Sequence, residues 1–308
     1  MYSEKPTRDF FHFSRAVVTN QIAAVAPSIY ARLSGQTGRG KVVQPRLIAD
    51  YFIRCLDDYR IQLGMTSIQF GAYLEGKTVL EYGPGDILGT ALLIYAHGAS
   101  AVHCVDRFSI HRMTKVNVQT YHELINSLKD EQLERARTAF NKYGVPESGL
   151  DASKISYRVT GDGLSGESQK FDLIVSRAVL EHVNNLPATF RDIKRALKPF
   201  GTSAHEVDLR SHGLDRYLPF DFLTWPTLLY GLMYKHKGLP NRVRLPTYRM
   251  LARSVGLEIK FLSRTGVLPP GSLTRIRPYL AEEFREMTDE DLACTVFRMN
   301  LGHQIVST

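Results

Sequence analysis

Hydrophobic and polar residues follow a recognisable order in the segment 77–108, which reads KTVLEYGPGDILGTALLIYAHGASAVHCVDRF. A short apolar run is followed by a glycine-rich turn, and helical spacing of apolar residues then extends from about Gly89 to His97. A second apolar run, Ala101 to Val105, ends on Asp106. The pattern predicts a strand, a turn, a helix and a second strand, which is the order of a nucleotide-binding βαβ unit.

Each part of this unit has a physical role in holding a ligand. Gly83 and Gly85 allow a sharp bend and a close approach of ligand to backbone, and the following helix presents free N–H groups. Asp106 stands at the end of the second strand, where a carboxylate can accept hydrogen bonds from both hydroxyls of a ribose. Glu81, just before the glycines, would repel an anionic pyrophosphate and favour a cationic amino acid moiety.

The apolar pattern downstream predicts further strands and a helical insertion. Alternating residues from Ile155 to Thr160 indicate a third strand, and the run from Phe171 to Ser176 indicates a fourth. The fifth and sixth are expected at Thr202–Asp208 and Leu257–Leu262, and an antiparallel last strand at Ala293–Leu301.

Five motifs in this order resemble those of class I S-adenosylmethionine (SAM)-dependent methyltransferases, the type 11 group. They are the segment from Val79 to Gly89, the acid Asp106, the turn Gly161-Asp162-Gly163, the run from Phe171 to Val183, and Leu197-Lys198-Pro199-Phe200-Gly201. Ile87 stands where the family commonly has its third glycine, and Gly89 comes two residues later.

The resemblance implies a Rossmann-like, seven-stranded, mostly parallel sheet with an antiparallel last strand, and SAM as cofactor. It also implies the positions that bind SAM. These are Glu81, Tyr82, Gly83, Gly85, Asp86, Gly89, Asp106, Arg107, Asp162, Gly163, Ser176 and Arg177.

The domain organisation follows from the same comparison. Residues 1–75 are expected to form a helical N-terminal extension or lid, and residues 76–308 the methyltransferase domain. The extension includes helical pieces between Ala16 and Leu33 with a break at Pro27, a flexible turn at 34–40, and an amphipathic helix from Pro45 to about Gly64. Leu47, Tyr51, Leu56 and Tyr59 are expected on one face of that helix, which either covers the SAM pocket or simply packs on the sheet. Two insertions are expected, a solvent-facing helical one at about 109–150 and a helical substrate cap at about 209–250.

Composition and charge narrow the functional class less sharply. Lys and Arg number 39 against 31 Asp and Glu, a net charge of +8, which indicates either a solvated surface or an acidic partner. The sequence has no run of Lys and Arg of the kind that binds nucleic acid, so we do not expect a nucleic-acid partner. Peripheral contact with a membrane is left open. Cys55, Cys104 and Cys294 are too far apart for a disulfide framework or a zinc site. Without a recognisable secretion signal or spanning segment, we expect a cytoplasmic protein, while the sequence leaves its oligomeric state open.

Methyl transfer to an alcohol requires a proton acceptor, and histidine suits that task near neutral pH. The candidates are His182, His205 and His212, with Asp208 placed four residues before His212 to orient it; a structural role for all three is the alternative. Glu181-His182 is expected one turn into the helix after the fourth strand. An Asp/His metal site stays open, because some sugar methyltransferases use magnesium, but no ligand spacing demands one and no metal ligand is assigned.

The acceptor is the least determined part of the prediction. His205, Trp225, Arg242 and Arg244 are candidates for binding it, because aromatic faces and arginines suit a sugar ring that carries phosphate or another acid. This segment is similar to methyltransferases of bacterial polysaccharide and lipopolysaccharide assembly, which implies O-methylation of a sugar or glycan. The alternatives are a small aromatic or polyketide acceptor, a SAM-binding scaffold without turnover, and a dinucleotide oxidoreductase, which Glu81 disfavours.

Overall fold

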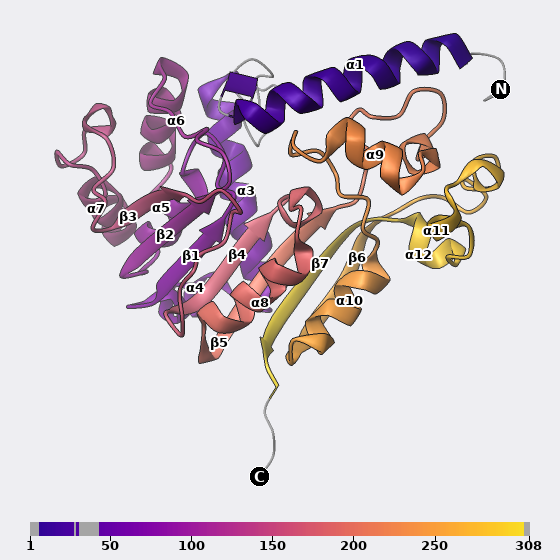
Figure 1. Cartoon of the computed structure of the whole chain (residues 1–308). Coiled ribbons are helices and arrows are strands. Elements are labelled where there is room, and N and C mark those ends of the chain that lie inside the picture. The colour runs from indigo at the N-terminus through magenta and orange to yellow at the C-terminus, as the bar shows by residue number, and fades with distance from the viewer. Residues whose placement is uncertain (1–5, 28, 31–42, 305–308) are drawn as a thin grey trace.

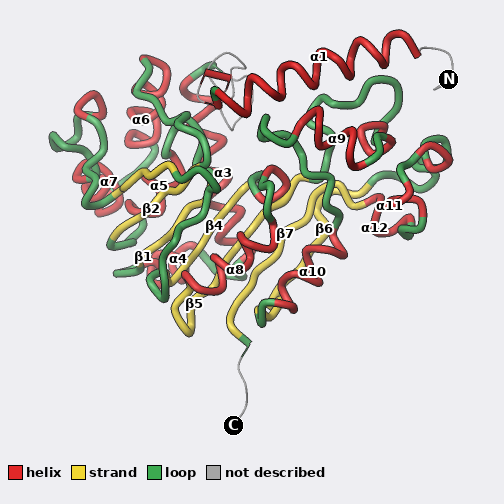
Figure 2. The backbone as a smooth tube through the Cα atoms, in the orientation of Figure 1, coloured by secondary structure: helices red, strands yellow, loops and turns green. Residues whose placement is uncertain are grey.

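The computed structural model describes residues 6–27, 29–30 and 43–304 and is built around one seven-stranded sheet (Figures 1 and 2). The strand order is β3-β2-β1-β4-β5-β7-β6. Strand β7 is antiparallel to both of its neighbours, and the other pairings are parallel. This confirms the predicted fold class. The strands are β1 Thr78–Tyr82, β2 Ala101–Asp106, β3 Ile155–Val159, β4 Phe171–Arg177, β5 Leu197–Asp208, β6 Leu257–Val267 and β7 Cys294–His303.

Strand β1 lies between β2 and β4, where the chain order reverses. Glu81 is in register with Cys104 of β2 and with Val175 of β4, so the carboxyl ends of the three strands meet at one edge. In an open α/β sheet, ligands bind in the crevice at this reversal point. The topology therefore places the glycine turn, Asp106 and the end of β4 around one crevice.

Alternate residues of the parallel strands point into two separate cores, as the period of a strand requires. Val79 and Val175 belong to the first core, whereas Leu80 and Ile174 belong to the second. Because both faces are buried, these strands read as continuous apolar runs in the sequence.

Five helices cover the first face, and two of them bury more than the sequence suggested. The predicted insertion at 109–150 forms α6 and α7, but it is not only solvent-facing, since Tyr121, Leu124 and Ala136 are buried in the first core. The charged residues at 129–135 concealed this apolar face. The elements here are α3 Pro45–Gln62, α4 Ser67–Leu74, α5 Gly89–Ala96, α6 Lys115–Asn126, α7 Asp130–Thr138 and the 3₁₀ turn η1 Pro146–Ser148.

Helices α8 (Leu186–Ala196) and α10 (Leu245–Ser254) cover the second face and lie in front of the sheet in Figure 1. Phe190 of α8 and Tyr248 of α10 are fully buried and contact each other with ring centroids 6.3 Å apart.

A third apolar cluster joins the insertion after β5 to both ends of the chain. It contains Phe222 and Met233 from the insertion, Ala16 from α1, and Phe284 from the segment before β7. In Figure 1, α1 and α9 lie together along the top of the molecule. The elements are α1 Pro6–Val25, η3 Asp221–Thr224, α9 Thr227–Tyr234, η4 Arg277–Tyr279, α11 Glu282–Arg285 and α12 Asp289–Ala293.

Helix α3 was predicted correctly in its bounds but only partly in its buried face. Tyr59 and Leu56 are buried, while Leu47 is half exposed and Ile48 and Phe52 point inward instead. The helix shares the first core with β1. Of the two interpretations, a cover for the SAM pocket or simple packing on the sheet, the structure agrees with packing on the sheet. The domain boundary at residue 75 stays a prediction. The turn expected at 34–40 lies outside the described residues. The end of the helical piece expected up to Leu33 also lies outside them.

Two local predictions were wrong for identifiable reasons. The fifth strand, expected to begin at Thr202, begins at Leu197 instead; Leu197 pairs with Phe171, and a register shift follows. Glu181 and His182 do not lie in a helix but in the 3₁₀ turn η2, Leu180–His182. Helix α8 begins later because the Asn185 side chain caps it, accepting the N–H of Ala188 at 3.1 Å.

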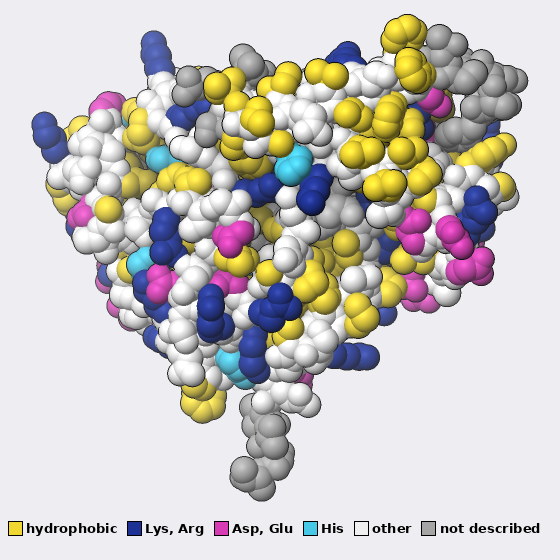
Figure 3. Space-filling model, viewed as in Figure 1, with side chains coloured by type: hydrophobic (Ala, Val, Ile, Leu, Met, Phe, Trp, Pro, Cys, Tyr) yellow, Lys and Arg dark blue, Asp and Glu magenta, His cyan; other side chains and the backbone are white. Residues whose placement is uncertain are grey.

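The surface in Figure 3 shows Lys and Arg side chains spread over the visible face rather than gathered in one stripe. Hydrophobic side chains gather over α1 and α9, where Phe10, Phe11 and Leu228 are mostly exposed. None of the helices in the described part of the chain is long and apolar enough to cross a bilayer. Peripheral contact with a membrane stays a prediction.

Candidate functional site

A cavity of about 500 Å³ opens at the carboxyl ends of β1, β2 and β4. It extends from Asp162 and Gly163 at one end, past the glycine turn, to His182 and His212 at the other. Of the sequence-predicted residues, those on its wall are Tyr82, Gly83, Gly85, Asp106, Arg107, Asp162, Gly163, His182 and His212.

The glycine turn forms the floor of this cavity. Gly83 has φ +61° and Gly85 has φ +84°, a region that side chains other than glycine rarely adopt. A Cβ placed on Gly83 would meet Val179 Cγ2 at 2.5 Å. Both glycines are therefore required by the backbone path, and Gly83 also by the close packing of the segment after β4.

Asp106 presents an unsatisfied carboxylate oxygen in the middle of the cavity. Its Oδ1 accepts the Phe108 N–H at 3.2 Å, whereas its buried Oδ2 has no partner among the described residues. Burial raises the pKa of Asp106 to about 6, and backbone N–H donors oppose the shift. A buried acceptor without a donor is costly, so this oxygen is suited to a ligand hydroxyl.

Glu81 lies beneath the glycine turn and not on the cavity wall. It is 6% exposed, and the Cys104 thiol lies within hydrogen-bond distance, 3.8 Å from Oε2. Burial raises the pKa of Glu81 to about 8. The phenyl ring of Phe52 packs directly on Gly89, so α3 closes this side of the turn.

Four more of the predicted cofactor residues also lie away from the cavity wall. Asp86 accepts from the Asn117 side chain, and Gly89 is buried under α3. Ser176 is fully buried and hydrogen-bonds His205 Nδ1 at 2.7 Å. Arg177 forms ion pairs with Asp58 and Glu206 on the side of the sheet covered by α3. These positions contribute to packing around the site rather than to its surface.

Two imidazoles stand at the far end of the cavity. The rings of His182 and His212 meet edge to face with centroids 4.8 Å apart. His212 Nε2 lies 3.2 Å from the Asp208 carbonyl oxygen and 3.8 Å from Asp208 Oδ1. Burial lowers the pKa of His182 to about 4, whereas the His212 side chain is 27% exposed. The structure thus brings His182, His212 and Asp208 together, as the spacing of Asp208 and His212 suggested.

His205 is not part of this group. It points into the core, is fully buried, and burial lowers its pKa to about 3. Side chains alternate along β5, so Ala204 packs in the first core and His205 points to the other side of the sheet, where it pairs with Ser176. His205 is therefore removed from the candidates for the base and for the acceptor site.

The two arginines predicted to bind the acceptor are structural in this fold. Arg244 is 1% exposed and donates to the backbone carbonyls of Leu209, Leu292 and Cys294. Arg242 is 6% exposed and donates to the Trp225 carbonyl and to Glu283. Neither lines the cavity, so the prediction that they contact the acceptor is corrected.

Trp225 lies against α1 rather than over the cavity. Its ring stacks near Phe13 of α1, and the Arg216 guanidinium sits 4.5 Å from the ring centroid. The tryptophan predicted to stack on a sugar therefore joins the cap to the N-terminal helix.

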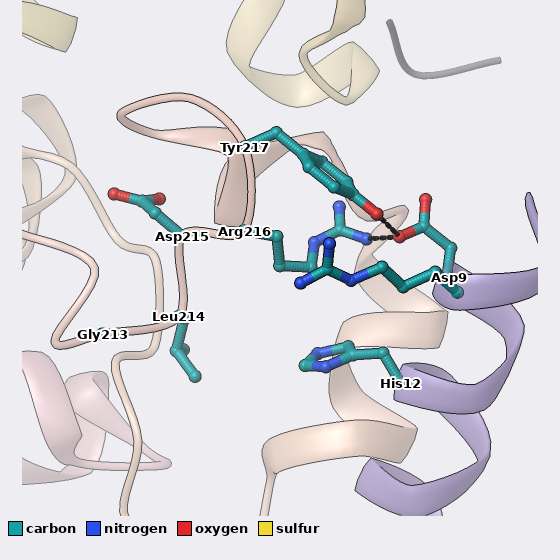
Figure 4. A pocket seen from close by; sticks show the side chains of 8 residues that line it. Asp9, His12, Gly213, Leu214, Asp215, Arg216 and Tyr217 are labelled. Carbon is teal, nitrogen blue, oxygen red and sulfur yellow. Dashed lines mark hydrogen bonds and ion pairs between the residues drawn. The ribbon is translucent and has the colours of Figure 1, made fainter. Parts of the chain in front are cut away.

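A second cavity lies between α1 and the segment after β5 (Figure 4). Asp9 of α1 points toward Arg216 and Tyr217 and accepts from Arg216 Nη1 at 2.5 Å and from the Tyr217 hydroxyl at 2.9 Å. An adjoining cavity shares His12 and Leu214 with it and reaches Leu239, which also lines the main cavity. A row of hollows thus runs from beneath α1 toward the two histidines.

Comparison with known families agrees with this geometry. Residues 50–260, more than half of the chain, match the model of the methyltransferase domain. The chain belongs to this methyltransferase family. This family match confirms the predicted enzyme class, SAM-dependent methyltransferase, and the predicted cofactor, SAM.

Solved structures of methyltransferases align with this chain at low sequence identity and with TM-scores below 0.5. A SAM-dependent methyltransferase from Mesorhizobium loti is 18% identical, with 76% of this chain and 95% of that chain covered and a TM-score of 0.41. Phosphoethanolamine N-methyltransferase 2 from Haemonchus contortus, in complex with phosphomonomethylethanolamine and S-adenosylhomocysteine, is 17% identical. That match covers 77% of this chain and 51% of that chain with a TM-score of 0.42. None of the curated proteins compared gave a significant match.

Several residues of the methyltransferase cavity had no signal in the sequence. Ala178, which has φ +51°, and Leu180 extend the wall past β4. Gly238 and Leu239 reach the cavity from the cap, more than 100 positions beyond Phe108 on the opposite wall. The Cβ of an alanine at Gly238 would meet the Phe108 ring at 2.9 Å, so only the folded chain shows that these walls touch.

Proposed function

We propose that this methyltransferase transfers the methyl group of SAM to a hydroxyl group, and that the acceptor is a sugar or glycan. The observation that carries the proposal is the His212–Asp208 pair, whose imidazole lines the same cavity as Asp106. SAM supplies an electrophilic methyl group and a good leaving group. The protein has to bind SAM, align the acceptor, and take up the proton that the hydroxyl loses.

The proposed cofactor contacts follow the cavity wall. Asp106 Oδ2, which has no partner in the described part of the chain, would accept the ribose hydroxyls. Asp162 is exposed and accepts the Leu164 N–H at 3.0 Å, which makes it a turn former that can still offer its other oxygen to an adenine amino group. The backbone of Gly83 and Gly85 would face the amino acid part of the cofactor, with the buried Glu81 carboxyl beneath the turn.

His212 is the better proton acceptor of the two imidazoles. The low pKa of His182, caused by burial, makes that ring a weak base. The His212 ring is partly exposed, and its Nε2 lies 3.8 Å from Asp208 Oδ1. His212 also holds φ +50°, a strained conformation for a non-glycine residue, and such strain occurs preferentially at functional sites.

The preference for a sugar or glycan rests on the hollow beneath α1. Arg15, Thr19, Tyr234 and Lys237 line it, and Leu239 joins it to the main cavity. Cationic and hydroxyl groups suit an acceptor that carries phosphate or another acid. Burial lowers the pKa of Lys237 to about 8, so the amine carries its charge at neutral pH.

A small aromatic or polyketide hydroxyl is the second candidate. The wall near His182 is formed by Val179, Leu180, Val183 and Leu239, which favours an apolar ring beside the methyl group. Both candidates use the same base and differ only in the acceptor.

The test is a screen of the full chain with SAM against sugar nucleotides, glycans and phenols, scored by the mass gain of one CH₂ unit. Turnover of the best acceptor by His212→Ala should fall by about 10²–10⁴-fold while SAM affinity stays unchanged. His122→Ala, which removes an exposed imidazole paired with Glu147, is the control and should keep full activity. Methylation restricted to amines would contradict the proposal, since no hydroxyl proton would then need a base.

A further inference from the structure

Glu181, His182 and His212 form a compact group of potential metal ligands at the acceptor end of the cavity. Each offers one ligand atom, and these atoms lie within 4.8 Å of one another. The first two belong to η2 and the third to the loop after β5, so the group is made by tertiary structure and has no spacing signature in the sequence.

Two atoms of this group are buried without a hydrogen-bond partner. Glu181 is 1% exposed; its Oε1 accepts the Asp208 N–H at 3.1 Å, but its Oε2 has no partner within the described ranges. His182 Nδ1 is also buried and has no hydrogen-bond partner within the described ranges. An unpaired buried carboxylate oxygen beside an unpaired imidazole nitrogen costs free energy unless a ligand satisfies both.

We propose that Glu181, His182 and His212 bind a divalent transition-metal ion of the zinc type, which holds the acceptor oxygen. Two imidazoles and one carboxylate are the donor set of a catalytic zinc site with three protein ligands and one open position. His182 and His212 line the cavity, so the open position faces the place of the acceptor. Magnesium fits poorly, because it prefers oxygen ligands.

The geometry requires only a small closure of the side chains. Ligands of a tetrahedral zinc ion lie roughly 3.4 Å apart, as follows from metal–ligand distances of about 2.1 Å. The partly exposed His212 ring can supply this movement. If His212 Nε2 carries the proton, it donates to the Asp208 carbonyl at 3.2 Å and leaves Nδ1 with a free lone pair. Such an outer hydrogen bond is typical of metal-binding histidines.

This inference rests on the proposed methyl transfer to a hydroxyl group and changes how the proton leaves. When the ion is bound, His212 is a ligand, and the hydroxyl on the ion is more acidic and releases its proton to solvent. The acceptor oxygen then forms its bond to the methyl carbon as the bond from that carbon to sulfur breaks. The bonding pair stays on sulfur, which turns the sulfonium into the neutral thioether.

Metal binding is tested on the chelator-treated full chain by calorimetry with Zn²⁺, Co²⁺ and Mg²⁺. We expect one equivalent of Zn²⁺ or Co²⁺, with the visible absorption of tetrahedral Co²⁺. Glu181→Gln, which keeps an acceptor for the Asp208 N–H, and His212→Ala should each weaken binding by at least about 100-fold, more than the loss of an outer-shell partner. His122→Ala is the matched control, because His122 and Glu147 form an exposed pair without a third ligand in the described chain. Absence of a stoichiometric ion, or binding that survives both variants, would overturn the site.

Activity and SAM affinity separate this inference from the function on which it rests. Chelator-treated protein should bind SAM normally, lose methyl transfer, and regain it with one equivalent of ion. Full transfer without any ion would overturn the metal role and leave His212 as the base. Failure to bind SAM in any state would instead contradict the proposed function.

Discussion

Val179, just after β4, packs on the α-carbon of Gly83 so closely that a Cβ there would lie 2.5 Å from Val179 Cγ2. The contact joins the turn after the first strand to the segment after the fourth, two parts of the chain far apart in sequence. Both residues line the main cavity, so the floor and the wall of the candidate site are built against each other. Any side chain at position 83 has to move one of them.

Gly83→Ala should therefore lower both stability and SAM affinity. The positive φ costs about 1–2 kcal/mol and the contact with Val179 adds about 1–3 kcal/mol. Gly64→Ala is the control, because Gly64 has φ +70° but nothing within 4 Å of the added Cβ. Thermal unfolding and SAM calorimetry on both variants measure the difference. Equal stability losses and unchanged SAM affinity would show that the Val179 contact does not matter.

SAM affinity should weaken as the pH falls through about 6. Burial raises the pKa of Asp106 to about 6, and its ionised form is the acceptor for ribose hydroxyls. Below that pH, affinity should fall by about tenfold per pH unit, because binding then requires loss of a proton. Asp106→Asn should bind SAM more weakly and without this dependence, whereas Asp162→Asn should keep it. A flat profile in the unaltered protein would remove Asp106 from the ribose site.

The same raised pKa has the opposite effect on the stability of the ligand-free protein. An acid with a folded pKa above its unfolded value contributes stability that is complete below the unfolded pKa and is lost as the pH rises through the folded pKa. For Asp106 that loss spans pH about 4 to 6. Ligand-free Asp106→Asn should lack this loss, which chemical unfolding at pH 4, 5 and 7 would show.

Arg244→Met should destabilise the fold instead of affecting acceptor affinity. Its guanidinium donates to three buried backbone carbonyls, and each acceptor left without a donor costs about 1–3 kcal/mol. Arg253→Met on the exposed side of α10 should change stability by less than about 0.5 kcal/mol. Denaturant unfolding compares the two. If Arg244→Met keeps its stability but loses turnover, the arginine belongs to the acceptor site after all.

Arg177, Asp58, Arg298 and Glu206 form a closed ring of four ion pairs with distances of 2.6–2.9 Å. The side chains are only 13–25% exposed, so the ring should resist salt better than surface pairs do. A double-mutant cycle of Asp58→Asn and Arg298→Met should give a coupling free energy of about 0.5–3 kcal/mol. A coupling of zero would mean that the two charges do not interact.

Asp9→Ala should loosen α1 without changing SAM affinity. The Asp9 carboxylate accepts hydrogen bonds from the Arg216 guanidinium and the Tyr217 hydroxyl, which join α1 to the segment after β5 (Figure 4). Hydrogen exchange of α1 and of residues 213–217 should therefore speed up. Asp57→Asn, which removes an exposed pair with Arg60 on α3, is the control and should leave α1 unchanged. Unaltered exchange in Asp9→Ala would show that the apolar cluster alone holds the helix.

The sequence by itself determined the sheet, the glycine turn and Asp106, and the resemblance of its motifs to a known family indicated the class of enzyme. These features depend on residues close together in the chain: apolar runs at strand spacing, glycines at positive φ, and a carboxylate at a strand end. Steric limits on the backbone fix the conformation of the glycine turn, and the parallel arrangement of the strands brings the turn and Asp106 to the same edge of the sheet.

Only the tertiary structure decided which of the remaining candidates face the cavity. Arg244 and Trp225 sit in a segment whose composition suits a binding surface, but the packing of the cap on α1 and β7 uses them internally. Glu181, His182 and His212 meet because η2 and the loop after β5 leave adjacent strands at the same edge of the sheet. Contacts between distant segments depend on how each side chain turns out of its strand or loop, and the sequence pattern does not contain that direction.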